Sequence, residues 1–185
     1  MRSERILSIS RRGFLALTGF AASILTLGRS FAAGQEDEMA AADRATAPGK
    51  LEKSKTEWRK LLPADRYAVL FEEGTERPGS SPLNGEKRVG TFVCAACYLP
   101  LFESKAKYES GTGWPSFFDP IPGRVDTRRD FKLVLPRTEY HCARCGGHQG
   151  HVFSDGPAPT GKRYCNNGVA LDFVPDGDAL PALRT

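Results

Sequence analysis

Large apolar residues recur with helical spacing in two short runs near residue 60. In residues 58–62 and again in 67–71 they stand at positions i, i+3 and i+4, which places each set on one face of a helix. Pro63 separates the runs and suits the first turn of the second helix. The residues concerned are Trp58, Leu61 and Leu62 in the first run and Tyr67, Leu70 and Phe71 in the second.

The helical period disappears after residue 74. Residues 74–87 (GTERPGSSPLNGEK) are rich in Gly, Pro and Ser and predict a long loop. Short apolar or alternating runs follow, separated by Gly, Pro and Asp, and this spacing predicts a mainly β domain of antiparallel sheets behind short N-terminal helices. The expected strands lie in VGTFVCAA (89–96), LPLFES (99–104), WPSFF (114–118), FKLVLP (131–136), EYHCA (139–143), HVFSD (151–155) and RYCNNGVALDFVP (163–175).

Residues 1–32 have the composition of a secretion signal. Arginines precede an apolar run over residues 14–27, and Ser30-Phe31-Ala32 supplies small residues for cleavage. The apolar run is too short for a comfortable transmembrane helix, although an uncleaved anchor is an alternative. SRRGFL (10–15) has the paired arginines of a twin-arginine signal. We therefore expect a periplasmic or otherwise exported protein, with no stable membrane insertion after cleavage near Ala33.

The signal also explains the net charge. The chain has 26 basic and 22 acidic residues, a formal net charge of +4. Because residues 1–32 contain five arginines and one glutamate, the remainder is close to neutral. The composition therefore gives no reason to expect a nucleic-acid partner.

The remainder of the chain is long enough for one domain with one core. Residues 33–52 are mostly small and polar and predict a flexible linker. We expect the catalytic domain in residues 53–178, followed by a C-terminal tail in residues 179–185.

Four of the five cysteines form two CxxC pairs. Each pair can aim two thiolates at one point, and two facing pairs give tetrahedral zinc coordination with Zn–S bonds of about 2.3 Å. Such a site has no open position for substrate, so its expected role is to clamp distant β segments. The expected zinc ligands are Cys94, Cys97, Cys142 and Cys145.

A redox role for the CxxC pairs is the alternative. It would be favoured by a helix beginning after the first pair, but residues 99–101 (Leu-Pro-Leu) indicate a strand. Gly146 follows the second pair, where the backbone can turn back onto a thiolate. Tyr98 takes that place in the first pair, an unusual residue if the turn needs a positive φ.

Cys165 is the fifth cysteine and has no partner in this scheme. A reactive thiol needs a lowered pKa or a neighbouring acid or base, together with partial exposure. Arg163 and Asn167 stand two residues to either side, so on a strand they share its face. Arg163 would favour the thiolate and Asn167 would offer an amide donor. The alternative is that Cys165 is a buried, inert residue.

Candidate acids and bases are few, because the chain has only three histidines. His148 and His151 could flank one site from a loop and the start of a strand. Histidines as zinc ligands are an alternative, but four thiolates already fill the shell of the metal. Trp114 stands among Gly and Pro residues, where its ring could form the wall of a pocket.

The motifs, taken in order, resemble the methionine-R-sulfoxide reductase (MsrB) family. The resemblance covers residues 54–175 and rests on TEWRKLL, TERP, the two CxxC turns, GWPSF, GGHQGHVFSDGP and RYCNN. It implies an MsrB-like β-tent fold with a four-cysteine zinc clamp. It also implies catalytic residues Cys165, His151 and His148, and substrate-binding or supporting residues Trp114, Asn167, Arg163 and Asp155.

The resemblance further implies reduction of the R epimer of methionine sulfoxide, in oxidised proteins or peptides, through a cysteine sulfenic acid. Many members carry a resolving cysteine at the position of Thr112. Because this chain lacks it, we expect regeneration by an external dithiol such as a thioredoxin-like protein. Two alternatives remain: a non-catalytic zinc-clamped β module for binding or chaperoning, and a Cys/His hydrolase that forms an acyl-enzyme.

Overall fold

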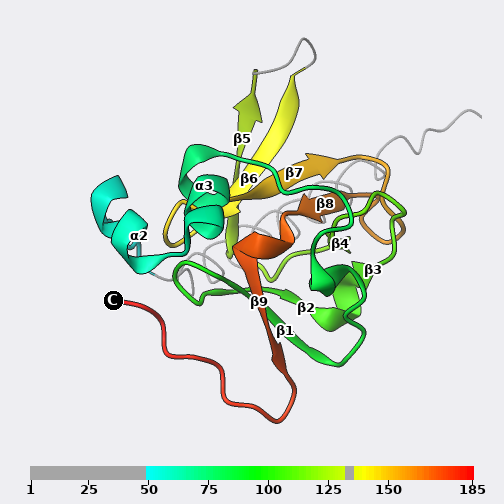
Figure 1. The fold of residues 1–185 in the computed structure, drawn as a ribbon. Coiled ribbons are helices and arrows are strands. Elements are labelled where there is room, and N and C mark those ends of the chain that lie inside the picture. The colour runs from blue at the N-terminus through cyan, green and yellow to red at the C-terminus, as the bar shows by residue number, and fades with distance from the viewer. Residues whose placement is uncertain (1–48, 132–135) are drawn as a thin grey trace, which may run out of the picture. The chain divides into compact units, whose positions relative to one another are not determined.

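The computed structural model describes residues 49–131 and 136–185 (Figure 1). The expected signal peptide, most of the expected linker and residues 132–135 of the expected strand FKLVLP lie outside the described residues. Within the described part, no helix has the length and apolar character needed to cross a bilayer.

Two short helices open the described chain, α2 (Lys55–Leu61) and α3 (Ala64–Glu72). Ser54 begins α2 with a capping box, in which its side chain and that of Glu57 bond each other's backbone N–H groups. Trp58 is 1% exposed and packs into the core, as expected. Leu61, which shares the expected apolar pattern, is 44% exposed instead, so α2 buries a narrower face than its spacing predicts.

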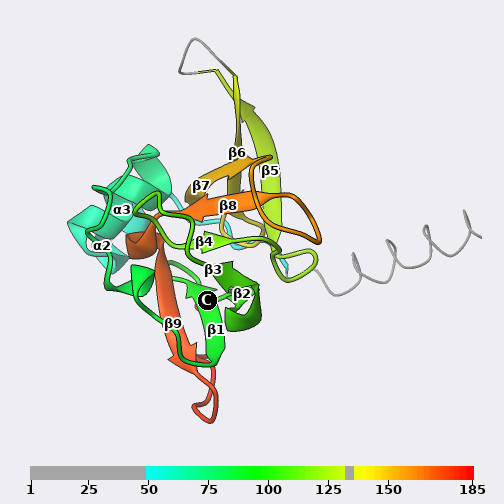
Figure 2. The same cartoon turned by 90° about the vertical axis from the view of Figure 1, so that its right-hand side faces the viewer.

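The strands of the described residues form two antiparallel sheets, as the hydrophobic pattern predicts (Figures 1 and 2). One sheet has the order β2-β1-β9 and the other the order β3-β4-β8-β7-β6-β5. The strands are β1 (Gly90–Cys94), β2 (Pro100–Glu103), β3 (Lys107–Tyr108), β4 (Ser116–Phe117), β5 (Val125–Asp130), β6 (Arg137–Cys142), β7 (His148–Phe153), β8 (Arg163–Asn166) and β9 (Leu171–Pro175). Short 3-10 turns are η1 (Pro82–Asn84), η2 (Ser104–Ala106) and η3 (Gly168–Ala170).

The expected strand over residues 163–175 is in fact two strands in different sheets. β8 belongs to the six-stranded sheet, the chain turns through η3, and β9 then pairs with β1, with Leu171 opposite Cys94. The turn packs tightly, since a Cβ added at Gly168 would lie 1.9 Å from the Ser81 hydroxyl oxygen. The segment 163–175, which contains Cys165, therefore bridges the two sheets.

Strand β5 is absent from the expected elements. It pairs along its whole length with β6, but most of its side chains are exposed and polar, so the sequence VDTRRD carries no hydrophobic pattern. Its strand conformation comes from the ladder with β6 rather than from burial of its own residues. β5 matters because it ends at a residue of the candidate active site.

The core is formed by aromatic rings from both sheets. Phe102 and Phe117 stack with centroids 4.1 Å apart, and Phe92 meets Phe117 edge-on at 4.9 Å. Tyr140 is fully buried against Phe102, and its hydroxyl donates to the Asn166 side chain at 2.6 Å. Each buried phenylalanine contributes about 1.5–3 kcal/mol, so this cluster holds the two sheets together.

Candidate active site

The two CxxC turns have the same local geometry. Tyr98 has φ of 63° and Gly146 has φ of 71°, and each backbone N–H donates to the carbonyl of the first cysteine of its pair, Cys94 or Cys142, at 2.8 and 2.9 Å. The left-handed conformation is costly for tyrosine. Arg184 holds Tyr98 there, because it donates to the phenol oxygen at 2.7 Å and stacks on the ring.

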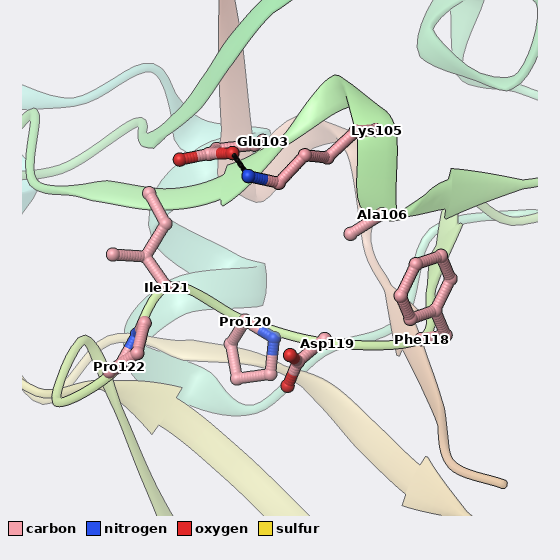
Figure 3. A pocket seen from close by; sticks show the side chains of 8 residues that line it. All are labelled: Glu103, Lys105, Ala106, Phe118, Asp119, Pro120, Ile121 and Pro122. Atoms are coloured by element: carbon pink, nitrogen blue, oxygen red, sulfur yellow. Dashed lines mark ion pairs between the residues drawn. The ribbon is translucent and has the colours of Figure 1, made fainter. Parts of the chain in front are cut away.

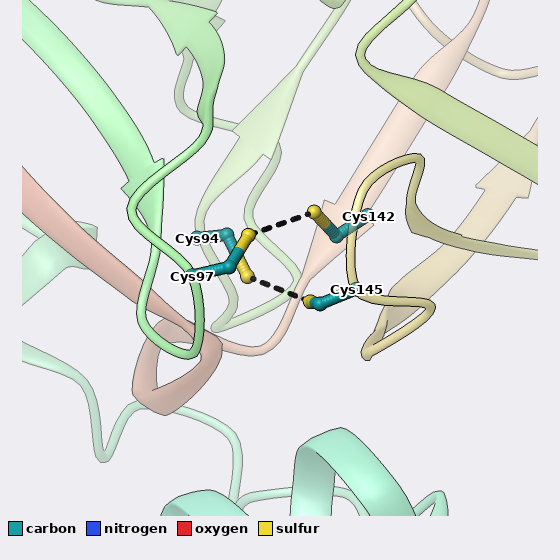
Figure 4. A group of neighbouring side chains, drawn as sticks. All are labelled: Cys94, Cys97, Cys142 and Cys145. Atoms are coloured by element: carbon teal, nitrogen blue, oxygen red, sulfur yellow. Dashed lines mark hydrogen bonds between the residues drawn. The ribbon is translucent and has the colours of Figure 1, made fainter. Parts of the chain in front are cut away.

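The four cysteines of these turns converge, which confirms their predicted clustering (Figure 4). The first turn joins β1 to β2 and the second joins β6 to β7, so the cluster lies where the two sheets meet. Two sulfur pairs run between the turns, at 3.7 Å for Cys94 with Cys145 and 3.5 Å for Cys97 with Cys142. A CxxC disulfide would instead pair sulfurs within one turn.

The donor set of the cluster fits a structural zinc ion. Tetrahedral Zn–S bonds of about 2.3 Å require sulfurs about 3.8 Å apart, close to the separations observed. Burial raises the pKa of the Cys94 thiol, and a bound cation is what would let such buried sulfurs ionise together. Gln149 supports the cluster from β7 by donating to the Cys94 sulfur at 3.5 Å.

Cys165 and His151 face each other across neighbouring strands. They are directly opposite in the β7–β8 ladder, and Gly150 beside them allows close approach, since a Cβ there would lie 1.9 Å from the Cys165 carbonyl oxygen. Both residues are partly exposed at a cavity of about 250 Å³. The cavity is lined by Thr75, Trp114, Arg137, Gly150, His151, Phe153, Cys165 and Asn167.

The pKa of the Cys165 thiol is raised, although two neighbouring side chains act to lower it. Burial raises its pKa, while the charge of Arg163 and a hydrogen bond with Thr112 act in the opposite direction without cancelling the effect of burial. The expected electrostatic help from Arg163 is therefore present but outweighed. The contact places Thr112 beside Cys165.

His151 is oriented by a buried carboxylate that the sequence did not reveal. Asp130, at the end of β5, is 6% exposed, and its Oδ2 lies 2.9 Å from His151 Nε2. The same oxygen accepts from Arg137 at 2.7 Å. Because an ionised carboxylate only accepts, His151 Nε2 carries the hydrogen and donates to Asp130. This contact fixes the ring at the edge of the cavity.

His148 lies behind His151 and does not line the cavity. The two rings are 5.5 Å apart, and His148 is 2% exposed. Burial lowers the pKa of His148 to about 4, so the ring is neutral at neutral pH. Its catalytic role remains a prediction, and any such role would act through its neighbour His151.

Trp114 and Asn167 are joined through Glu76 in the loop that follows α3. The indole N–H of Trp114 donates to the Glu76 carbonyl at 3.3 Å, and the Asn167 side-chain oxygen accepts from the Glu76 N–H at 3.1 Å. The Glu76 carboxylate accepts the backbone N–H groups of Gly168 and Val169. The amide nitrogen of Asn167 donates to a backbone carbonyl of β7, so this side chain orders the loop as well as lining the cavity.

Arg163 and Asp155 support the site from one side without lining the cavity. The guanidinium of Arg163 makes two hydrogen bonds of 2.8 Å to the Asp155 carboxylate and lies 4.3 Å above the Phe153 ring. The pair therefore positions Phe153, which does line the cavity.

A second cavity, of about 350 Å³, lies beside η2 and the segment after β4 (Figure 3). Its lining contains no histidine or cysteine, and its charged groups include an ion pair between Lys105 and Glu103. It therefore offers neither a thiol nor an imidazole. The lining residues are Glu103, Lys105, Ala106, Phe118, Asp119, Pro120, Ile121 and Pro122.

Comparison with known proteins agrees with the site. Residues 62–175 match the model of the SelR domain. The chain is 54% identical over 124 residues to the peptide methionine sulfoxide reductase MsrB of Methanosarcina barkeri, covering 66% of this chain and 87% of that protein. It is 52% identical over 127 residues to the protein of the same name from Pseudomonas fluorescens, covering 68% and 98%. The MsrB of Methanosarcina mazei is 50% identical over 133 residues, covering 71% and 95%. This chain belongs to the SelR domain family, together with these MsrB proteins.

Proposed function

We propose that this protein is a peptide-methionine (R)-S-oxide reductase with Cys165 as its nucleophile. The observation that carries the proposal is the pairing of Cys165 with His151 across β7 and β8, at the mouth of a cavity that Trp114 also lines. A thiol and an oriented imidazole that line one small cavity suit nucleophilic attack on a sulfoxide together with delivery of a proton to its oxygen.

In the proposed reaction, the Cys165 sulfur attacks the sulfoxide sulfur and His151 protonates the oxygen. The hydroxyl group then passes from the methionine sulfur to the Cys165 sulfur, and the S–S bond formed in the attack breaks. Methionine leaves, and Cys165 is left as a sulfenic acid. Asp130 keeps the His151 ring in place. The face of Trp114 offers an apolar surface for the S-methyl group, which would determine the epimer that turns its oxygen toward His151.

We propose that an external dithiol, such as a thioredoxin-like protein, returns Cys165 to the thiol. The dithiol is oxidised to a disulfide and the oxygen leaves as water. The chain has five cysteines, and the other four lie together in the cluster between the sheets. The residue beside Cys165 at the usual resolving position is Thr112, which cannot form a disulfide.

The cysteine cluster is proposed to hold Zn²⁺ as a structural ion. Metal analysis of the purified chain should give about one tightly held zinc, and chelation should unfold the domain. A protein that stayed fully folded after losing its metal would contradict a structural role.

Export through a twin-arginine signal in residues 1–32 is likewise proposed, from the paired Arg11 and Arg12 before the apolar run. Fractionation of a bacterial host should find the protein outside the cytoplasm. The double variant Arg11→Lys/Arg12→Lys should stay inside, and normal export of that variant would contradict the assignment.

The activity is tested with the zinc-loaded chain, dithiothreitol and the separated R and S epimers of an N-blocked methionine sulfoxide. We expect methionine from the R epimer alone, none with Cys165→Ser, and weak activity with His151→Ala that rises at lower pH. Full activity of Cys165→Ser would refute the assignment. A folded, metal-loaded chain that reduced neither epimer would favour a non-catalytic β module.

A further inference from the structure

Three side chains outside the four-cysteine cluster bring potential metal ligands to one point. Glu139 and His141 stand two apart on β6 and share one face of the sheet, and His148 lies opposite His141 on β7. Glu139 Oε1 lies 2.9 Å from His141 Nε2 and 2.5 Å from His148 Nδ1. The three residues are 3%, 8% and 2% exposed.

These three atoms are in contact, but their contacts do not have the directions of hydrogen bonds. None of Glu139 Oε1, His141 Nε2 and His148 Nδ1 has a hydrogen-bond partner with acceptable geometry in the structure. Buried polar atoms are nearly always hydrogen-bonded, so three unpartnered atoms at one place call for an explanation. Ligand atoms around a shared ion behave in this way, because their lone pairs point at the ion and not at each other.

One oxygen of the Glu139 carboxylate is turned toward the two histidines and away from Arg128. Arg128 donates to the other carboxylate oxygen of Glu139, Oε2, at 2.9 Å, which leaves Oε1 available. The same carboxylate is thereby oriented, as a metal ligand usually is by its outer neighbours.

We propose that Glu139, His141 and His148 bind a divalent transition-metal ion such as Zn²⁺, at a second site separate from the four-cysteine cluster. Two imidazoles and one carboxylate are a ligand set that such ions favour. Bonds of about 2.0–2.2 Å at tetrahedral angles would place the ligand atoms about 3.3 Å apart, so small side-chain movements complete the site.

The proposed site does not depend on the reductase activity, but it lies next to it. His148 packs against His151, which faces Cys165. An ion on His148 Nδ1 would fix that ring and add positive charge behind the imidazole that faces the cavity. Three protein ligands leave a fourth coordination position, which a water molecule would fill.

The test uses the full chain with zinc already held by the four cysteines, titrated with Co²⁺ as the probe. We expect one further ion per chain, giving weak visible absorption without the thiolate-to-cobalt charge-transfer band of a cysteine site. Metal analysis after desalting should show that the first zinc is retained. We expect the second ion to bind with a dissociation constant of about 10 μM or lower. Failure to take up that ion at a free Co²⁺ concentration of about 100 μM, ten times this constant, would overturn the proposal.

Variants distinguish this site from its surroundings. His141→Gln should weaken binding of the second ion by at least about tenfold while keeping the first zinc and the circular-dichroism spectrum. Glu139→Gln should act in the same direction, although it also disturbs the contact with Arg128. His151→Gln is the matched control and should bind the second ion normally. Unchanged uptake by His141→Gln, or loss of uptake in His151→Gln, would place the ion elsewhere and refute the site.

Discussion

Replacement of Glu76 by glutamine tests whether one loop carboxylate holds the turn between β8 and β9 in place. The two oxygens of Glu76 accept the N–H groups of Gly168 at 2.6 Å and Val169 at 3.0 Å, at the turn between β8 and β9. In Glu76→Gln one oxygen becomes an NH₂ group, which faces a backbone donor and cannot accept. The turn then loses a hydrogen bond to a charged group, worth about 1.5–3 kcal/mol, so the free energy of unfolding should fall by that amount.

Urea unfolding of the zinc-loaded chain, followed by tryptophan fluorescence, measures this loss. With a slope of about 2 kcal/mol per molar, the midpoint should fall by about 0.7–1.5 M at unchanged slope. Glu72→Gln is the control. It breaks an ion pair with Arg59 whose side chains are 48% and 68% exposed, and such pairs contribute about 0–1 kcal/mol. Equal midpoints for the two variants would refute the reasoning.

Three further predictions concern Cys165 and its neighbours. Since burial raises the pKa of Cys165, alkylation of the free enzyme by iodoacetamide should still accelerate as the pH rises to 9, whereas a plateau below pH 7 would contradict the effect of burial. Thr112→Cys should form a disulfide with Cys165 after one turnover without added reductant, detectable by mass spectrometry as a loss of two hydrogens; accumulation of sulfenic acid alone would show that the two positions do not meet. Gly150→Ala should lower stability by about 1–3 kcal/mol and reduce kcat/KM at least about tenfold, because the new methyl group pushes β7 from β8. Gly85→Ala, with its nearest neighbouring atom at 3.9 Å, is the control and should leave both quantities nearly unchanged.

The parts of the fold that were predictable are those with a short-range signal. The CxxC pairs predicted their own convergence, and the apolar alternation predicted antiparallel sheets. By contrast, RYCNNGVALDFVP reads as one strand, because nothing in its alternation shows that the chain changes sheets at Asn167. The exposed strand β5 was missed for a related reason, since its partner β6 determines its conformation.

The candidate site was predictable only in its reactive and aromatic residues. Cys165, His151 and Trp114 do meet at one cavity. Asp130 and Glu139 could not be found, because an acidic residue in a polar segment is usually exposed, and their burial depends on how β5 and β6 pack. Long-range packing also placed His148 behind the cavity, although its sequence distance from His151 suggested a shared wall.

The position of the cysteine cluster has a consequence for how the chain folds. The two CxxC hairpins are local and can form early, but the pairing of β9 with β1 brings Leu171 to Cys94 and closes a loop of about 77 residues. An ion held by both hairpins places Cys145 beside Cys94 first, so the loop still to be closed shrinks to about 26 residues. The entropic barrier to that closure then falls by about 1 kcal/mol. Metal present during refolding should therefore raise the folding rate constant roughly fivefold, in addition to its effect on the stability of the folded state.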